Sequence, residues 1–142
     1  MRVALPMFLV LAALTFITEG CKRSDSATVT GGGPGGHAVL PVIPEHHGGF
    51  VLDCTVYIKY GTTIAPPDGV YDDSIQCSTT SSPDHTTPMA VFRNLKAGQY
   101  YLYGTGLHPG YNPPNVKGGL PYIIHQEIPQ QNFYLHVYSY QP

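Results

Sequence analysis

Apolar and polar residues alternate in several short segments of the chain after residue 37. In the segment 50–60 (FVLDCTVYIKY), Cys54, Val56 and Ile58 are separated by more polar neighbours. A period of two residues is typical of a strand with one buried and one solvent-facing side. Further strand-like segments lie at 37–44, 74–80, 89–94, 99–105, 119–128 and 132–140. About seven short strands predict an all-β fold, a single antiparallel Greek-key β-sandwich.

A continuous apolar segment precedes these strands. Residues 3–17 (VALPMFLVLAALTFI) follow the positively charged start Met1-Arg2. A membrane-spanning helix needs about 20 apolar residues, which is more than this segment supplies. A short positive start, an apolar core and a small residue before a cleavage point are typical of a secretory signal peptide. We therefore predict that residues 1–20 are a signal peptide.

The segment around the predicted cleavage point reads Gly20-Cys21-Lys22. It resembles the lipobox of bacterial lipoproteins, in the looser form found in Bacteroidetes. The resemblance implies that Cys21 is lipidated, with palmitate among its acyl groups, and becomes the first residue of the mature protein. Two lipid signals are enough for stable membrane attachment. We therefore expect a lipid-anchored protein of the bacterial cell envelope, on the periplasmic or the surface side of the outer membrane.

Between Cys21 and the first predicted strand, residues 22–36 read KRSDSATVTGGGPGG. Such a composition buries too little apolar surface to offset the entropy of ordering the chain. Glycine-rich chains of this kind behave as flexible linkers. The chain is therefore predicted to contain a signal peptide (1–20), a lipidated cysteine with a flexible tether (21–36) and one folded domain (37–142).

One motif specifies the predicted sandwich more closely. The pattern F-x-x-L-x-x-G-x-Y-x-L has its fixed positions at Phe92, Leu95, Gly98, Tyr100 and Leu102. We expect Phe92 to end one strand pointing inward and Leu95 to close the end of the sandwich. Gly98 is expected to allow a tight turn through a positive φ. Tyr100 and Leu102 would then share the inner side of the next strand.

This motif resembles the segment between two central strands in carboxypeptidase-regulatory-like domains, also called transthyretin-like, prealbumin-like or Cna-B-like domains. The segment 54–58 stands where those domains carry a strand of the form A-x-V-x-I, with Cys54 in the alanine position. The resemblance covers most of 37–140 and extends to small lipoproteins of the Bacteroidetes type. It implies a transthyretin-like sandwich and a non-catalytic module for binding or assembly at the envelope.

The charge of the chain limits the classes of partner that it can bind. The 142 residues include 7 Lys and Arg against 9 Asp and Glu, a formal net charge of −2. A chain without a basic excess has little to neutralise phosphates, so we expect no nucleic-acid partner.

Besides Cys21, the chain contains Cys54 and Cys77. In an oxidising exported compartment such a pair normally forms a disulfide, and the alternative is two buried thiols.

Tyrosine is unusually frequent, with 11 residues and no tryptophan. Tyrosine joins apolar area to a hydroxyl group, which suits binding to a glycan or to another envelope protein. Aromatic residues also cover sheets without binding a ligand, and that alternative stays open. The candidate binding face consists of tyrosines from predicted strands: Tyr57, Tyr60, Tyr101, Tyr103, Tyr134, Tyr138 and Tyr140.

Histidine is as frequent as Lys and Arg together, with 7 residues. Neutral imidazole is a common ligand of Zn, Cu and Ni ions. His46 and His47, with Asp72 or Asp73, are the candidate ligands of an envelope metal-binding protein, which is the alternative function. The chain has no H-x-H pair, and metal sites generally show tighter spacing, so most histidines are expected at the surface.

A catalytic function is a third hypothesis. Intradiol dioxygenases share a related sandwich and hold Fe(III) with tyrosines and histidines, and the Tyr100-Tyr101 pair and abundant histidines of this chain are similar to that ligand set. The chain lacks their closely spaced histidine pair, and it has no G-x-S-x-G, P-loop or C-x-x-C motif. We therefore expect neither an enzyme nor a cofactor.

Overall fold

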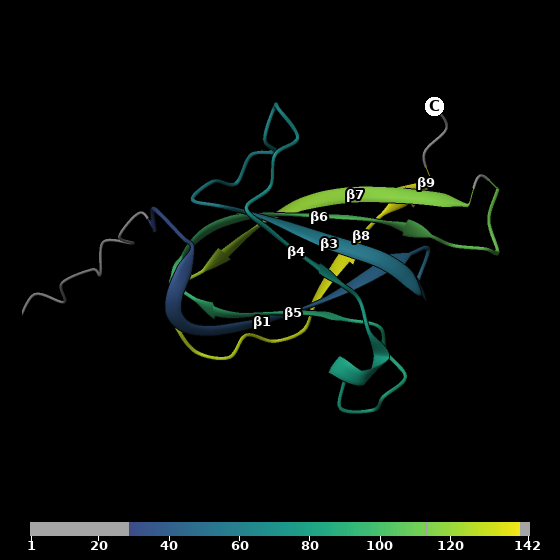
Figure 1. Ribbon diagram of the computed structural model, residues 1–142, viewed down its shortest axis with the longest axis horizontal. Coiled ribbons are helices and arrows are strands. Elements are labelled where there is room, and N and C mark those ends of the chain that lie inside the picture. The colour runs from purple at the N-terminus through teal and green to yellow at the C-terminus, as the bar shows by residue number, and fades with distance from the viewer. Residues whose placement is uncertain (1–28, 113, 140–142) are drawn as a thin grey trace, which may run out of the picture.

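The computed structural model describes residues 29–112 and 114–139, which form two packed β-sheets (Figure 1). The first sheet contains β1 (Pro34–His46), β2 (Gly49–Phe50), β5 (Ala90–Leu95) and β8 (Phe133–His136). The second sheet contains β3 (Asp53–Tyr60), β4 (Asp73–Gln76), β6 (Gly98–Leu107), β7 (Asn115–Ile124) and β9 (Tyr138–Ser139). Helical structure within the described residues is limited to one 3₁₀ turn, η1 (Thr79–Ser81). The predicted all-β sandwich is confirmed.

Most neighbouring strands in both sheets run antiparallel. The second sheet has the order β4-β3-β6-β7-β9, and β6 pairs along its length with β3 on one side and β7 on the other. In the first sheet, β1 pairs antiparallel with β2 and β5 but parallel with β8. Because β7 and β8 belong to different sheets, the chain crosses between the sheets and enters the first one alongside β1.

Several observed strands differ from the predicted ones at their ends, among them β4 and β7. The predicted strand 74–80 stops at Gln76, and η1 occupies its last part. β7 begins at Asn115, four residues before the predicted start at 119, because Asn115 pairs with Leu107 at the end of β6. Pairing with a neighbouring strand therefore extends β7 into a segment whose glycine and polar content favours a loop.

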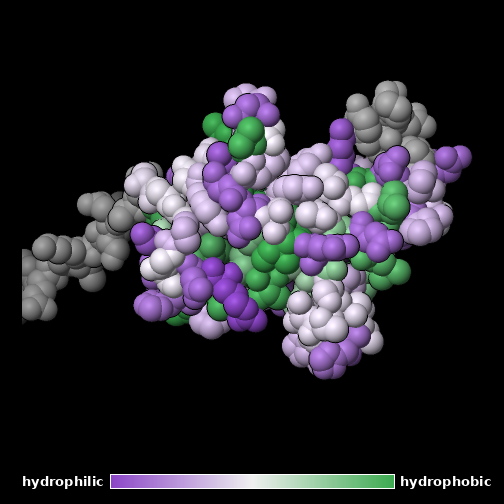
Figure 2. Space-filling view, viewed as in Figure 1, coloured by the Kyte–Doolittle hydropathy of each residue, from purple (hydrophilic) through white to green (hydrophobic). Residues whose placement is uncertain are grey.

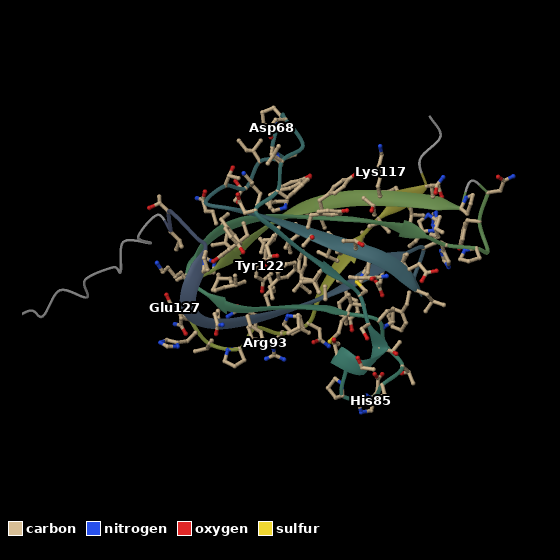
Figure 3. The ribbon with its side chains drawn as sticks, in the orientation of Figure 1. Asp68, His85, Arg93, Lys117, Tyr122 and Glu127 are labelled. Atoms are coloured by element: carbon tan, nitrogen blue, oxygen red, sulfur yellow. The ribbon has the colours of Figure 1, made fainter. Side chains whose placement is uncertain are left out.

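Burial in the core follows the alternation predicted for 50–60. Cys54, Val56 and Ile58 on β3 are at most 1% exposed, and Ile58 lies opposite Leu102 of β6. Tyr122 of β7 points between the two sheets and packs against this core (Figure 3). Full burial of an apolar side chain such as Val56 or Ile58 contributes about 1.5–3 kcal/mol. The inner faces of the two sheets thus form one continuous core.

The five motif residues lie in this core. The expected positive φ at Gly98 is not observed, and the positive φ near this turn belongs to Asn94, at 57°. Glycine is required at position 98 for another reason, because a Cβ there would overlap the backbone of Gly32. The buried motif positions are Phe92, Leu95, Gly98, Tyr100 and Leu102.

The glycine-rich segment that ends at residue 36 is packed against the domain. The carbonyl of Gly31 accepts a hydrogen bond from the Gln99 N–H (2.7 Å), and that of Gly33 accepts one from the Lys96 N–H (2.9 Å). The Tyr100 hydroxyl accepts from the Gly33 N–H (2.9 Å) and donates to the Lys96 carbonyl (2.6 Å). The predicted tether is therefore too long, since its last residues belong to the fold. Composition misses this because the partners of these glycines lie far away in the sequence.

Candidate functional site

The outer face of the second sheet carries neighbouring tyrosines. The strand register places Tyr57 of β3 opposite Tyr103 of β6, and Tyr103 opposite Gly119 of β7. Tyr101 precedes Tyr103 by two residues and therefore lies on the same face of β6. Lys117 of β7 also belongs to this face and points away from the first sheet (Figure 3). Three of the candidate tyrosines therefore share one outward-facing surface.

A fourth tyrosine joins them from the loop between β3 and β4. The Tyr71 ring is stacked on Tyr103, with centroids 5.5 Å apart and an interplanar angle of 15°, and lies 5.5 Å from the Tyr57 ring. All three side chains are half-buried. Sequence reasoning missed Tyr71 because alternation carries no information in a loop. We term this group the tyrosine face: Tyr57, Tyr71, Tyr101 and Tyr103.

The Tyr101 ring lies against the backbone of β7. A Cβ at Gly119 would be 2.6 Å from the Tyr101 hydroxyl oxygen and 2.8 Å from its ring atom Cε1. Only glycine leaves room for the ring at this position. The Tyr101 side chain is half-buried, so part of the ring remains open to contact with an apolar surface of a ligand.

The loop 61–72 rises beside the tyrosine face. Asp68, near its tip, projects on the outer side of the second sheet (Figure 3). Ile64 and Val70 of the same loop are 73% and 56% exposed. Figure 2 shows hydrophobic surface at the tip of this loop. The loop therefore adds exposed apolar groups next to the aromatic surface.

Asp72 fixes the return of this loop to the sheet. Its carboxylate accepts hydrogen bonds from the Lys59 ammonium group (3.0 Å) and from the Tyr60 backbone N–H (2.7 Å). Desolvation raises the pKa of Asp72, but the two contacts outweigh it and leave the pKa below its ordinary value. Burial raises the pKa of Tyr71 to about 12. At neutral pH Asp72 is therefore an ionised acceptor, and Tyr71 retains a hydroxyl donor.

Two shallow clefts flank the tyrosine face. One measures about 370 Å³ and has Thr55, Thr105 and Lys117 among its lining residues. The other measures about 390 Å³ and lies under the loop 61–72. The first offers hydroxyl and charged groups, and the second places such groups beside tyrosine rings, so the surface can hold a ligand that is partly apolar and partly rich in hydroxyl groups. The second cleft is lined by Tyr57, Gly69, Tyr71, Asp72, Asp73 and Ser74.

The remaining candidate tyrosines lie elsewhere. Tyr134 is exposed on β8 in the first sheet, and the inward-facing Tyr60 ring packs against Tyr100 at a centroid distance of 6.0 Å. Tyr138 is 65% exposed on β9, at the edge of the second sheet. Tyr140 lies outside the described residues. The face expected from the sequence therefore does not include Tyr60 or Tyr134.

The four candidate metal ligands are not brought together. Asp72 bonds to Tyr60 at the end of β3, whereas His46 bonds to His108, which follows the end of β6 that pairs with the start of β3. Within residues 29–112 and 114–139, no group of three or more His, Cys, Asp or Glu side chains is arranged to hold a metal ion. The expected ligand set is therefore split between opposite ends of the sandwich: His46, His47, Asp72 and Asp73.

The two cysteines of the domain lie directly opposite each other at the start of the β3–β4 pair. The Cys77 N–H donates to the Cys54 carbonyl (2.8 Å), and both side chains are free thiols. Contact with the Cys77 thiol, followed by burial, raises the pKa of Cys54. Opposed residues of antiparallel strands bring their Cα atoms within the range that a disulfide spans. The disulfide therefore stays a prediction that the strand pairing permits.

Cys21 and the predicted signal peptide lie outside the described residues. Within the part of the chain that the structure describes, no helix has the length and apolar character needed to cross a membrane. Comparison with protein-family models, with curated proteins and with solved structures finds no match for the chain. The likeness to carboxypeptidase-regulatory-like domains therefore remains a prediction, beyond the β-sandwich itself.

Proposed function

We propose that this protein is a lipid-anchored cell-envelope protein whose sandwich is a non-catalytic binding module for a glycan. The observation that carries the proposal is the contact between the Tyr57, Tyr71 and Tyr103 rings on one outward-facing surface. A sandwich can serve many functions, so the argument rests on this surface and not on the fold.

The chemistry of the tyrosine face favours a glycan over a charged ligand. A sugar ring has apolar C–H surfaces that stack on an aromatic ring, and hydroxyl groups at its edge. The exposed part of the Tyr101 ring offers apolar contact, and Tyr71 and Ser74 offer hydroxyl groups in the adjoining cleft. Lys59 and Asp72, beside the face, form an ion pair at 3.0 Å. Their charges offset each other, which favours a neutral partner.

The predicted lipid anchor places this module at a membrane surface. Gly20-Cys21-Lys22 supports lipidation, and the acyl groups on Cys21 would supply the attachment. Because β1 starts at Pro34, few residues separate the anchor from the packed segment. The domain would therefore stay close to the membrane and bind glycans of the envelope itself.

Glycan binding can be measured through tyrosine fluorescence, since the chain contains no tryptophan to mask it. We suggest titrating the purified protein with cello-, chito- and malto-oligosaccharides and with peptidoglycan fragments. At least one of these should bind, and Tyr101→Ala or Tyr103→Ala should weaken it about tenfold or more, equivalent to about 1.4 kcal/mol. Tyr134→Ala, an exposed tyrosine of the other sheet, should leave the affinity unchanged. No binding across this set, or equal affinity in the Tyr101 and Tyr134 variants, would contradict the proposal.

The anchor has its own test. Cells grown with an alkyne analogue of palmitate should incorporate the label into the wild-type protein, which should fractionate with membranes. Cys21→Ser should lose the label and move to the soluble fraction, because the thiol that carries the lipid is gone. Cys77→Ser is the matched control and should remain labelled. Membrane retention of the Cys21→Ser protein would show that the attachment has another origin.

A further inference from the structure

A second cluster of side chains lies at the end of the sandwich where β1 and β6 finish. His46 ends β1 and is buried, His108 follows β6, and Tyr111 lies in the β6–β7 loop. The Tyr111 ring centroid is 4.5 Å from both the His46 and the His108 ring, and His47 stacks on Tyr111 from the β1–β2 turn, with centroids 5.4 Å apart. Ser139 of β9 completes the cluster. None of these residues belongs to the tyrosine face.

Both ring nitrogens of His46 face a partner. Its Nε2 lies 3.0 Å from the Ser139 hydroxyl oxygen, and its Nδ1 lies 3.0 Å from the Nδ1 of His108. Two imidazole nitrogens at this separation share either one proton or one cation. Neutral imidazoles bind transition metals through an unprotonated nitrogen. The pair is therefore arranged either as a hydrogen bond or as two adjacent ligands.

The contact with Ser139 allows the second of these states, because a serine hydroxyl oxygen can accept a hydrogen bond. If the Ser139 oxygen accepts a hydrogen bond from the His46 Nε2–H, the Nδ1 of neutral His46 carries a lone pair directed at His108. Metal-binding histidines almost always donate their other ring N–H to such a partner, which fixes the tautomer and the ring orientation. The cluster therefore supplies a first ligand pair together with the group that orients one of its members.

We propose that His46 and His108 bind a copper(II) ion through their Nδ1 atoms, with Ser139 as the residue that positions His46. With metal–nitrogen bonds of about 2.0–2.1 Å, two ligands at a right angle lie about 2.9 Å apart, whereas tetrahedral ligands lie about 3.3 Å apart. The observed 3.0 Å lies between these two separations, so both nitrogens can bind one ion. Copper(II) binds nitrogen ligands most tightly among the divalent ions of its row.

The residues around the His46–His108 pair leave room for a copper ion that can exchange with solvent. Within the described residues, no third His, Cys, Asp or Glu side chain joins the pair, so water would fill the other positions of the ion. A cleft of about 180 Å³ adjoins His46 and is lined in part by Glu45 and His136, whose side chains lie 3.7 Å apart. A site with two protein ligands and open positions binds copper reversibly.

The test is a titration of the full chain, purified in detergent and stripped with a chelator, with copper sulfate. Calorimetry should show one copper ion per chain, and the electron paramagnetic resonance spectrum should show coupling to two nitrogen nuclei. His108→Gln should remove one of these couplings and weaken binding at least tenfold. Ser139→Ala should keep both couplings and weaken binding about tenfold, because it removes only the orienting group.

His125→Gln is the matched control, since His125 is exposed and lies outside the cluster. It should bind copper as the wild type does. Circular dichroism would verify that each variant is folded, and the nitrogen count in the wild-type spectrum decides the question even if a variant fails to fold. Coupling to no nitrogen or to one, equal affinity in wild type and His108→Gln, or tighter binding of zinc than of copper would overturn the proposal. None of these outcomes bears on the glycan-binding surface.

Discussion

Tyr100 and Tyr101 are neighbours in β6, yet the two sides of the strand use them differently. Tyr100 faces inward, is fully buried, and joins Gly33 to Lys96 through hydrogen bonds of its hydroxyl group. Tyr101 faces outward, is half-buried and rests on Gly119. The hydroxyl group of the inner tyrosine is used within the fold, whereas part of the outer ring stays exposed to solvent. Residue type alone therefore does not identify a candidate binding tyrosine. The side of the strand on which the tyrosine lies determines whether its ring is available to a ligand.

Glycines on the two sides of the same sheet show the same contrast. Gly98 admits the backbone of Gly32, which belongs to the packed N-terminal segment. Gly119 admits the side chain of Tyr101, which belongs to the candidate site. Both positions exclude a Cβ, but one serves the closure of the domain and the other serves the shape of its surface. This difference predicts that substitutions on the inner side cost stability and those on the outer side cost binding.

The largest expected effect comes from truncating the inner tyrosine. Tyr100→Ala should lower the free energy of unfolding by about 3–5 kcal/mol, because it empties a fully buried aromatic site and leaves backbone groups unpaired. Tyr103→Ala, on the outer side of the same strand, should cost about 1 kcal/mol, roughly the value of its ring contacts. Urea unfolding followed by circular dichroism measures both values. Equal losses would mean that the two sides of β6 do not differ as described.

The second effect concerns the glycine-rich segment. Gly98→Ala should destabilise the domain by about 1–3 kcal/mol, because the added methyl group overlaps Gly32 and forces the segment away. Gly110→Ala is the matched control, since a Cβ at that position meets no atom within 4 Å. Thermal unfolding compares the two variants, and hydrogen exchange at Gln99, whose N–H bonds to Gly31, reports the loss of contact. A Gly98→Ala protein as stable as its control would show that the segment is a free tether after all.

The sequence predicted those features that depend on nearby residues. Alternation in 50–60 identified β3 and its inward residues, and the spacing of the motif identified buried positions from Phe92 to Leu102. Other features depend on partners that no local pattern reveals. The glycines before residue 36 resembled a linker because their hydrogen-bond partners lie on β6 and the turn before it.

The candidate sites divide in the same way. Tyr57, Tyr101 and Tyr103 could be placed on one face, since alternation along a strand fixes which residues point outward. Tyr71 could not, because the path of the loop 61–72 brings it back over the sheet. His108 was passed over for a similar reason, because it follows β6 in a loop and meets His46 only in the folded chain. Sequence reasoning therefore identified the site residues that lie on strands and missed those that lie in loops.

The smallest expected effect tests whether Tyr71 belongs to the outer surface in the way described. Burial raises the pKa of its hydroxyl group to about 12, from an ordinary value of 10.0. The folded state therefore keeps this proton between those two pH values while the unfolded state loses it, so stability falls as the pH rises through that window. Tyr71→Phe should remove one tyrosine from the highest step of the phenolate absorbance titration and lessen the alkaline loss of stability. An unchanged step in Tyr71→Phe would place the Tyr71 ring away from its observed position against Tyr103.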